Sequence, residues 1–108
     1  MTLQAARVQT KSITDWDSFH SVFAETMGFP SFYGRNMDAW IDCMTGFDDG
    51  MTRFTVAPGE LFHLEIADAA DFQRRVPEIF QAFIECAAFV NSRRIERGEP
   101  PVLALILL

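Results

Sequence analysis

The most regular pattern of apolar and polar positions lies in the first quarter of the chain. Apolar side chains recur there every three or four residues, as on the buried face of a helix: Trp16, Phe19, Phe23 and Met27. Thr14 is a suitable N-cap, and Asp17 three residues later fits a capping box. Gly28 is a typical helix end, and Pro30 prevents continuation. The pattern predicts a helix capped by Thr14 and ending at Gly28, with its tryptophan as a core anchor.

A second helix is predicted after a turn at Ser31–Arg35. Asn36 is a suitable N-cap, and Gly46 is a suitable end. Apolar residues at helical spacing are expected to face inward: Met37, Trp40, Ile41 and Met44. Asp38 and Asp42 are four residues apart, so they are neighbours on the surface of this helix.

Three segments have the pattern of β-strands. Residues 61–66, LFHLEI, alternate in polarity, so Phe62, Leu64 and Ile66 share one face. Residues 102–108, VLALILL, do not alternate, which is typical of a strand buried on both faces in a parallel sheet. Residues 2–9 are a weaker candidate, since few of them are apolar.

Two further helices are predicted before the last strand. A short one spans residues 69–75, and a longer one has Pro77 in its first turn and ends at Gly98. The longer helix has apolar residues at helical spacing: Ile79, Phe80, Phe83, Ala87 and Val90. Residues 48–60 are expected to form a loop. This order predicts a single α/β domain, residues 1–108, with a small three-stranded parallel sheet, flanking helices and right-handed crossovers.

The charge of the chain is negative and unevenly distributed. The net charge is −6, and between residues 12 and 50 seven acidic residues face a single basic one, Arg35. A nucleic-acid partner requires a basic footprint, so direct binding to nucleic acid is not expected. An acidic surface instead attracts a cationic protein and accelerates its association.

The remaining titratable residues suggest no cofactor. Cys43 and Cys86 lie among apolar neighbours in predicted helices, where a free thiol behaves as a small apolar group. His20 and His63 have no further ligand at metal-binding spacing. The first ten residues do not resemble a signal peptide, and the final apolar run is too short to cross a membrane. We therefore expect a cytoplasmic protein without cofactor or metal.

The paired carboxylates of the second helix allow more than one interpretation. Asp38 and Asp42 can form an ordinary solvated helix face or part of a surface for a cationic partner. A catalytic pair would need a cleft and unequal environments, and no residue pattern indicates either, so an enzyme is not expected. Phe32 and Tyr33 are adjacent in the preceding turn, so one of them is expected on the surface, where it could contact a partner or have no function.

The segment from Phe29 to Phe47 closely resembles the corresponding region of the barstar family, small intracellular inhibitors of secreted ribonucleases. The shared features are the Phe-Pro exit from the first helix, the aromatic-Tyr-Gly-x-Asn turn and the run Asp-Ala-x-x-Asp-Cys-x-Thr-Gly. The likeness weakens over the predicted loop. It resumes in the strand at 61–66, in Phe80-Gln81-x-Phe83-x-Glu85 and in the final apolar strand.

The resemblance implies a barstar-like fold and a non-enzymatic inhibitor that blocks the active site of a cationic ribonuclease or related toxin in a 1:1 complex. It implies that Asp42 is the central acidic contact, that Asp38 flanks it and that Glu85 is peripheral. It also implies an aromatic contact at Phe32. The residues predicted to bind the partner are Phe32, Tyr33, Gly34, Asn36, Asp38, Ile41, Asp42, Thr45, Gly46 and Glu85.

Three residues depart from the barstar pattern. Phe32 lacks a tyrosine hydroxyl, Arg35 replaces an acidic residue, and Ile41 replaces an exposed tryptophan. These changes leave an alternative open, namely a barstar-like interaction module whose partner is not a nuclease. The loop at 48–60 follows the predicted binding helix directly, so it could extend the surface or take no part in it.

Overall fold

The computed structural model describes residues 4–108, which contain one three-stranded sheet. The strands are β1 (Ala5–Val8), β2 (Phe62–Ile66) and β3 (Leu103–Leu107), all parallel and ordered β1-β2-β3. The predicted α/β fold with a small parallel sheet is therefore confirmed. The weak strand candidate at 2–9 is a strand over Ala5–Val8, and residues 2 and 3 of that prediction lie outside the described residues.

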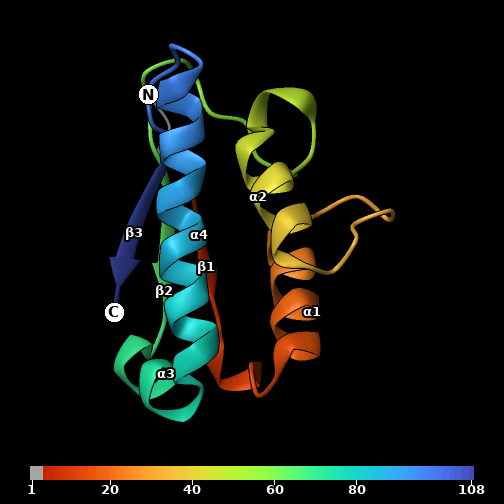
Figure 1. Ribbon diagram of the computed structural model, residues 1–108, viewed down its shortest axis with the longest axis vertical. Helices are drawn as coiled ribbons and strands as arrows, with labels where there is room; N and C mark the ends of the chain where they lie inside the picture. The colour runs from red at the N-terminus through yellow and green to blue at the C-terminus, as the bar shows by residue number, and fades with distance from the viewer. Residues whose placement is uncertain (1–3) are drawn as a thin grey trace.

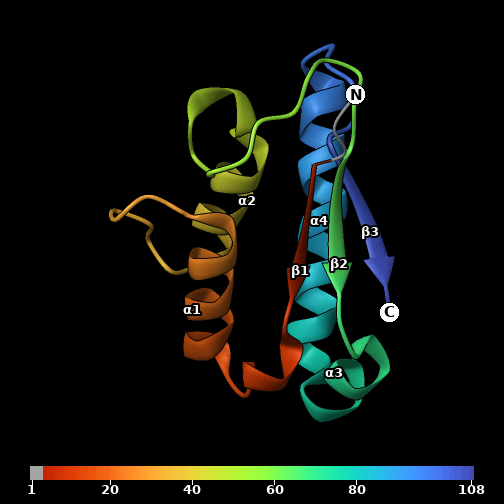
Figure 2. The same ribbon diagram turned by 180° about the vertical axis from the view of Figure 1, so that it is seen from behind.

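In the described part of the chain four helices accompany the sheet: α1 (Trp16–Met27), α2 (Met37–Thr45), α3 (Ala69–Arg75) and α4 (Pro77–Glu96). Two short 3₁₀ turns, η1 (Thr10–Ser12) and η2 (Phe47–Asp49), extend the connections. In Figure 1 α4 lies in front of the strands, with α2 and α1 beside it. Figure 2 shows the strands from behind, with α4 beyond them. None of the helices formed by the described residues is long and apolar enough to cross a membrane.

The central strand β2 supplies one side of the core. Phe62, Leu64 and Ile66 are all buried, as their alternation predicts, and they belong to the same apolar cluster as the buried side chains of the helices. Trp40 of α2 is also fully buried, and its ring lies 5.6 Å from that of Phe23 and 5.8 Å from that of Phe83. Since these two rings belong to α1 and α4, Trp40 fixes α2 against both neighbours.

The prediction that the last strand is buried on both faces is wrong. β3 is an edge strand, and its burial decreases along its length until Leu107 and Leu108 are 52% and 53% exposed. An unbroken apolar run is typical of a strand in a parallel sheet, but it does not reveal whether that strand is central or at an edge. Within residues 4–108, β2 is the only strand that pairs with β3.

The N-terminus of α1 also differs from the prediction. Asp15, not Thr14, is the N-cap, and its Oδ1 accepts a hydrogen bond from the Ser18 amide at 2.8 Å. Ser18 completes the capping box, because its hydroxyl accepts a hydrogen bond from the Asp15 amide. Asp17 therefore takes no part in the capping box, and it is exposed. Trp16 is 39% exposed and is no core anchor, because it lies at the first position of the helix.

The other predicted helix limits agree well with the structure. Asn36 caps α2 by accepting from the Ala39 amide at 2.8 Å, and Gly46 ends it. Pro77 opens α4, as predicted. Of the apolar residues expected to face inward from α2, Trp40 and Met44 are fully buried, whereas Met37 and Ile41 are half-buried.

Candidate partner-binding surface

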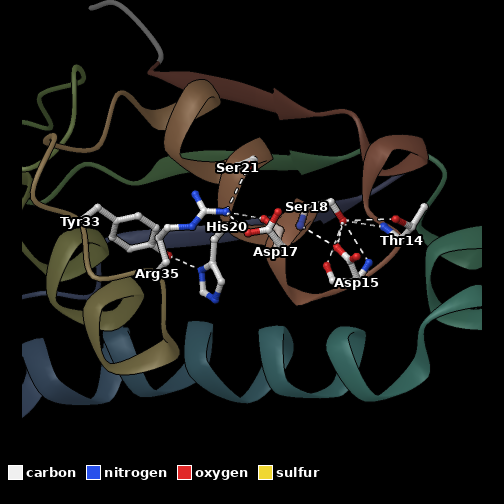
Figure 3. Close-up of polar contacts among 8 residues, drawn as sticks. All are labelled: Thr14, Asp15, Asp17, Ser18, His20, Ser21, Tyr33 and Arg35. Atoms are coloured by element: carbon white, nitrogen blue, oxygen red, sulfur yellow. Dashed lines mark hydrogen bonds and ion pairs between the residues drawn. The ribbon is translucent and has the colours of Figure 1, made fainter.

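The turn before α2 is tied to α1 by two side chains, as Figure 3 shows. The Tyr33 hydroxyl lies 2.6 Å from Nδ1 of the buried His20. Arg35 donates through Nη2 to a carboxylate oxygen of Asp17 at 2.7 Å, to the Asp17 carbonyl at 2.8 Å and to the Ser21 hydroxyl at 3.0 Å. Its φ of 53° lies in the left-handed region, which a non-glycine residue enters only when neighbouring contacts hold it there. The start of α2 is thus positioned by α1.

Burial keeps the His20–Tyr33 pair uncharged. Burial lowers the pKa of His20, and the nearby Arg35 guanidinium lowers it further, against a smaller opposing effect of Asp17. Burial also raises the pKa of the Tyr33 hydroxyl. The pair is therefore a neutral hydrogen bond at neutral pH, and acid should weaken the anchor of the turn.

We expect the protein to lose stability as the pH falls through about 6.5, the ordinary histidine value. Because the native pKa of His20 lies below that value, the unfolded chain binds the proton more readily, and stability rises with pH across this interval. Urea unfolding at a series of pH values would measure the slope. His20→Gln should flatten the dependence of stability on pH. Both proteins keep the other histidine, His63, so the difference between them reports on His20. An equal slope in both would contradict a protonation-sensitive anchor at His20.

The two adjacent aromatic residues of the turn separate as expected. Phe32 is 75% exposed, whereas Tyr33 is half-buried and packs with its ring 4.7 Å from that of Phe29. Gly34 and Asn36 are exposed in the same turn, but the Asn36 side chain is already engaged as the helix cap. Phe32 is therefore the large apolar side chain that this turn presents to solvent.

Carboxylates from α2 and α4 lie near one another. Asp38 and Asp42 are exposed on α2, and Glu85 is exposed on α4, where Gln81 donates to it at 3.0 Å. Burial raises the pKa of the Cys86 thiol, and the neighbouring charges of Glu85 and Asp38 raise it further. The structure therefore brings together acidic side chains that are far apart in the sequence.

Sequence reasoning missed a basic residue in this surface. Arg93 of α4 donates from Nη1 to Oδ1 of Asp42 at 2.7 Å. Phe89, one turn earlier on α4, is 55% exposed. Glu85, Phe89 and Arg93 follow one another at intervals of four, and this helical spacing is the signal that could have placed them on one side of α4.

The end of α2 is built into the interior. Thr45 is buried, and its hydroxyl donates to the Ile41 carbonyl at 2.6 Å. Gly46 is also buried, and a Cβ at that position would lie only 2.8 Å from Cγ of Met51. The buried Arg94 of α4 donates to the Thr45 carbonyl at 3.0 Å. These intramolecular contacts stabilise the end of α2. Contact of Thr45 and Gly46 with a partner stays a prediction.

Comparison with protein-family models gives a match to Barstar (barnase inhibitor) over residues 3–106. The chain belongs to the barstar family. The match spans almost all of the chain, including the loop between α2 and β2 where the sequence likeness is weakest. Comparison with curated proteins found no match. Membership confirms the family resemblance and indicates an inhibitor of the barnase-inhibitor type.

The departures from the barstar pattern have distinct structural settings. Arg35 points to α1, where Asp17 takes up its charge, so it acts as a tie for the turn. Ile41 is half-buried and packs against the core. The exposed aromatic rings of the turn and of α4 are instead those of Phe32 and Phe89.

Among residues 4–108, no three side chains from His, Cys, Asp and Glu are placed to hold a metal ion. Cys43 is buried and Cys86 is half-buried, and both are free thiols. Burial raises the pKa of each thiol, which favours the unreactive protonated form.

Proposed function

We propose that this protein inhibits a cationic ribonuclease or a related toxin by covering its active site in a 1:1 complex. The observation that carries the proposal is membership of the barstar family along nearly the whole chain. The exposed carboxylates of Asp38, Asp42 and Glu85, from two adjacent helices, supply the surface that such an inhibitor needs.

Inhibition of this kind works by occupying the place of the substrate. A ribonuclease binds the phosphates of RNA with basic side chains, and a carboxylate can accept the same charge-assisted hydrogen bonds. Asp42 would be the central mimic of phosphate, with Asp38 and Glu85 as supporting charges and Phe32 as an apolar contact at the margin. Because Tyr33 and Arg35 fix the turn to α1, the partner meets a surface that is already ordered.

Titration of the protein into barnase at low salt would test this proposal. We expect tight 1:1 binding, with an association rate that falls steeply as salt is added, because the Debye length shrinks from about 30 Å at 0.01 M to about 3 Å at 1 M. Stopped-flow fluorescence at several salt concentrations would measure that rate. No binding to barnase would contradict a barnase-type target and direct the search to other cationic toxins by the same assay.

A second candidate function is an interaction module whose partner is not a nuclease. Two observations favour it: Phe32 and Phe89 are exposed, and Asp42 is already paired with Arg93. Such a module would bind mainly through apolar contacts, so the association rate would change little with salt. The salt series therefore separates the two functions.

A further inference from the structure

The Asp42–Arg93 ion pair lies within the surface that the proposed function assigns to the partner. The side chain of Asp42 is 63% exposed and that of Arg93 is 35% exposed, so both reach solvent. Among the residues that the structure describes, Arg93 has no second ion-pair partner, and Asp42 is the acceptor of its one side-chain hydrogen bond. The guanidinium has five N–H donors, so it has donors beyond the Nη1 group that bonds Asp42.

The pair divides the surface into two parts. Asp38 on α2 and Glu85 on α4 form an acidic part without a basic side chain paired to either one in residues 4–108. Asp42 and Arg93 form a mixed part, about one and two helical turns further along these helices. Phe89 lies between Glu85 and Arg93 on the same side of α4.

A purely basic partner does not fit this arrangement well. A cation that approaches Asp42 also approaches Arg93, and like charges at an interface disfavour binding. If the partner covers Arg93 without supplying an acceptor, the guanidinium loses water and keeps unsatisfied donors. A carboxylate opposite Arg93 removes both penalties and leaves Asp42 able to accept from a neighbouring basic group.

We propose that Arg93 determines partner specificity and selects a partner with an acidic group beside the basic groups that face Asp38, Asp42 and Glu85. This inference rests on the proposed function, because it takes the α2–α4 surface to be the binding surface. It adds to that function the charge pattern of the binding site on the partner. An all-basic site is then a poorer match than a site of mixed charge.

Two short peptides can probe this preference without a known partner: hexaarginine, and a hexapeptide of alternating arginine and glutamate. Their affinities would be measured by NMR titration at about 10 mM salt, where screening is weak. Arg93→Gln should tighten hexaarginine binding by roughly three- to fivefold, because the side chain that competes with the peptide for Asp42 is lost. The size of the change is that of one exposed ion pair. The same change should weaken or leave unchanged the binding of the mixed peptide, so its preference shifts toward hexaarginine.

Arg97→Gln is the matched control, because it removes the same charge from an exposed position near the end of α4 that has no side-chain contact to Asp42. We expect a much smaller shift in preference from it. Equal shifts from both variants would show that net charge alone matters, and would overturn the inference.

Barnase separates this inference from the proposed function. If barnase does not bind while the peptide preference still depends on Arg93, the barnase-type function fails and the specificity role stands. If barnase binds the natural protein but both variants shift the peptide preference equally, the inhibitor function stands and the role of Arg93 falls.

Discussion

Asp42→Ala should weaken the complex with a ribonuclease by about 2 kcal/mol or more, or roughly 30-fold in the dissociation constant. Asp42 is the central carboxylate of the proposed surface, and burial against a basic site would make its hydrogen bonds strong. The substitution also leaves Arg93 without its carboxylate partner on α2, next to the basic groups that Asp42 would have bound. Calorimetric titration into barnase at low salt would measure the change.

Glu25→Ala provides the control for this experiment. Glu25 is exposed on α1 and makes no ion pair within residues 4–108, so the substitution removes the same charge away from the proposed surface. We expect its effect to be limited to long-range attraction, which salt screens. Similar losses of affinity from the two substitutions would place the binding site elsewhere.

The elements of the site could be predicted because their signals are local. Asn36 and Gly46 define the ends of α2 through contacts within a few residues, and the four-residue spacing of Asp38 and Asp42 puts both on one surface. The cap of α1 is Asp15 and not the predicted Thr14, and the reason is equally local. Thr14 and Asp15 are adjacent, and either can cap a helix. Asp15 is the cap because it exchanges two hydrogen bonds with Ser18.

The contacts that give the surface its charge pattern are not local. Asp42 and Arg93 are 51 positions apart, and their meeting depends on how α2 and α4 lie side by side. Spacing alone puts Arg93 on the side of Glu85, but it does not reveal which carboxylate lies opposite. The same limit applies to Arg35, which replaces an acidic residue of the barstar pattern. The sequence does not reveal that its charge is paired with Asp17 of α1.

Sheet order is likewise absent from an apolar pattern. The apolar run at residues 102–108 correctly predicts a strand, but it gives no information on how many strands pair with it. Because β2 is central and β3 lies at an edge, Leu107 is half-exposed although its side chain is apolar. The position of a strand depends on the path of the connecting helices, which pattern reasoning does not supply.

Trp40→Ala should lower the free energy of unfolding by about 3–5 kcal/mol. Trp40 is fully buried between Phe23 and Phe83, so its removal leaves a cavity at the junction of α1, α2 and α4. Since small domains are stable by only about 5–15 kcal/mol in total, much of the stability would be lost. Urea unfolding followed by circular dichroism would measure the loss.

Trp16→Ala is the matched comparison, because Trp16 lies at the first position of α1 and is much more exposed. Its removal should cost about 1 kcal/mol or less. Comparable losses at the two positions would contradict the assignment of Trp40 as the anchor of α2.

Trp40→Phe separates packing from polarity at the same position. The indole Nε1–H of Trp40 is buried without a hydrogen-bond partner among the described residues, which carries a desolvation cost. Phenylalanine removes that donor and keeps most of the ring, so we expect only about 1 kcal/mol of destabilisation. Trp40 packs on the core side of α2, whereas Asp38 and Asp42 lie on its exposed side. A variant that keeps the ring should therefore keep α2 in place and preserve the arrangement of the carboxylates, while Trp40→Ala should weaken partner binding even where the protein remains folded.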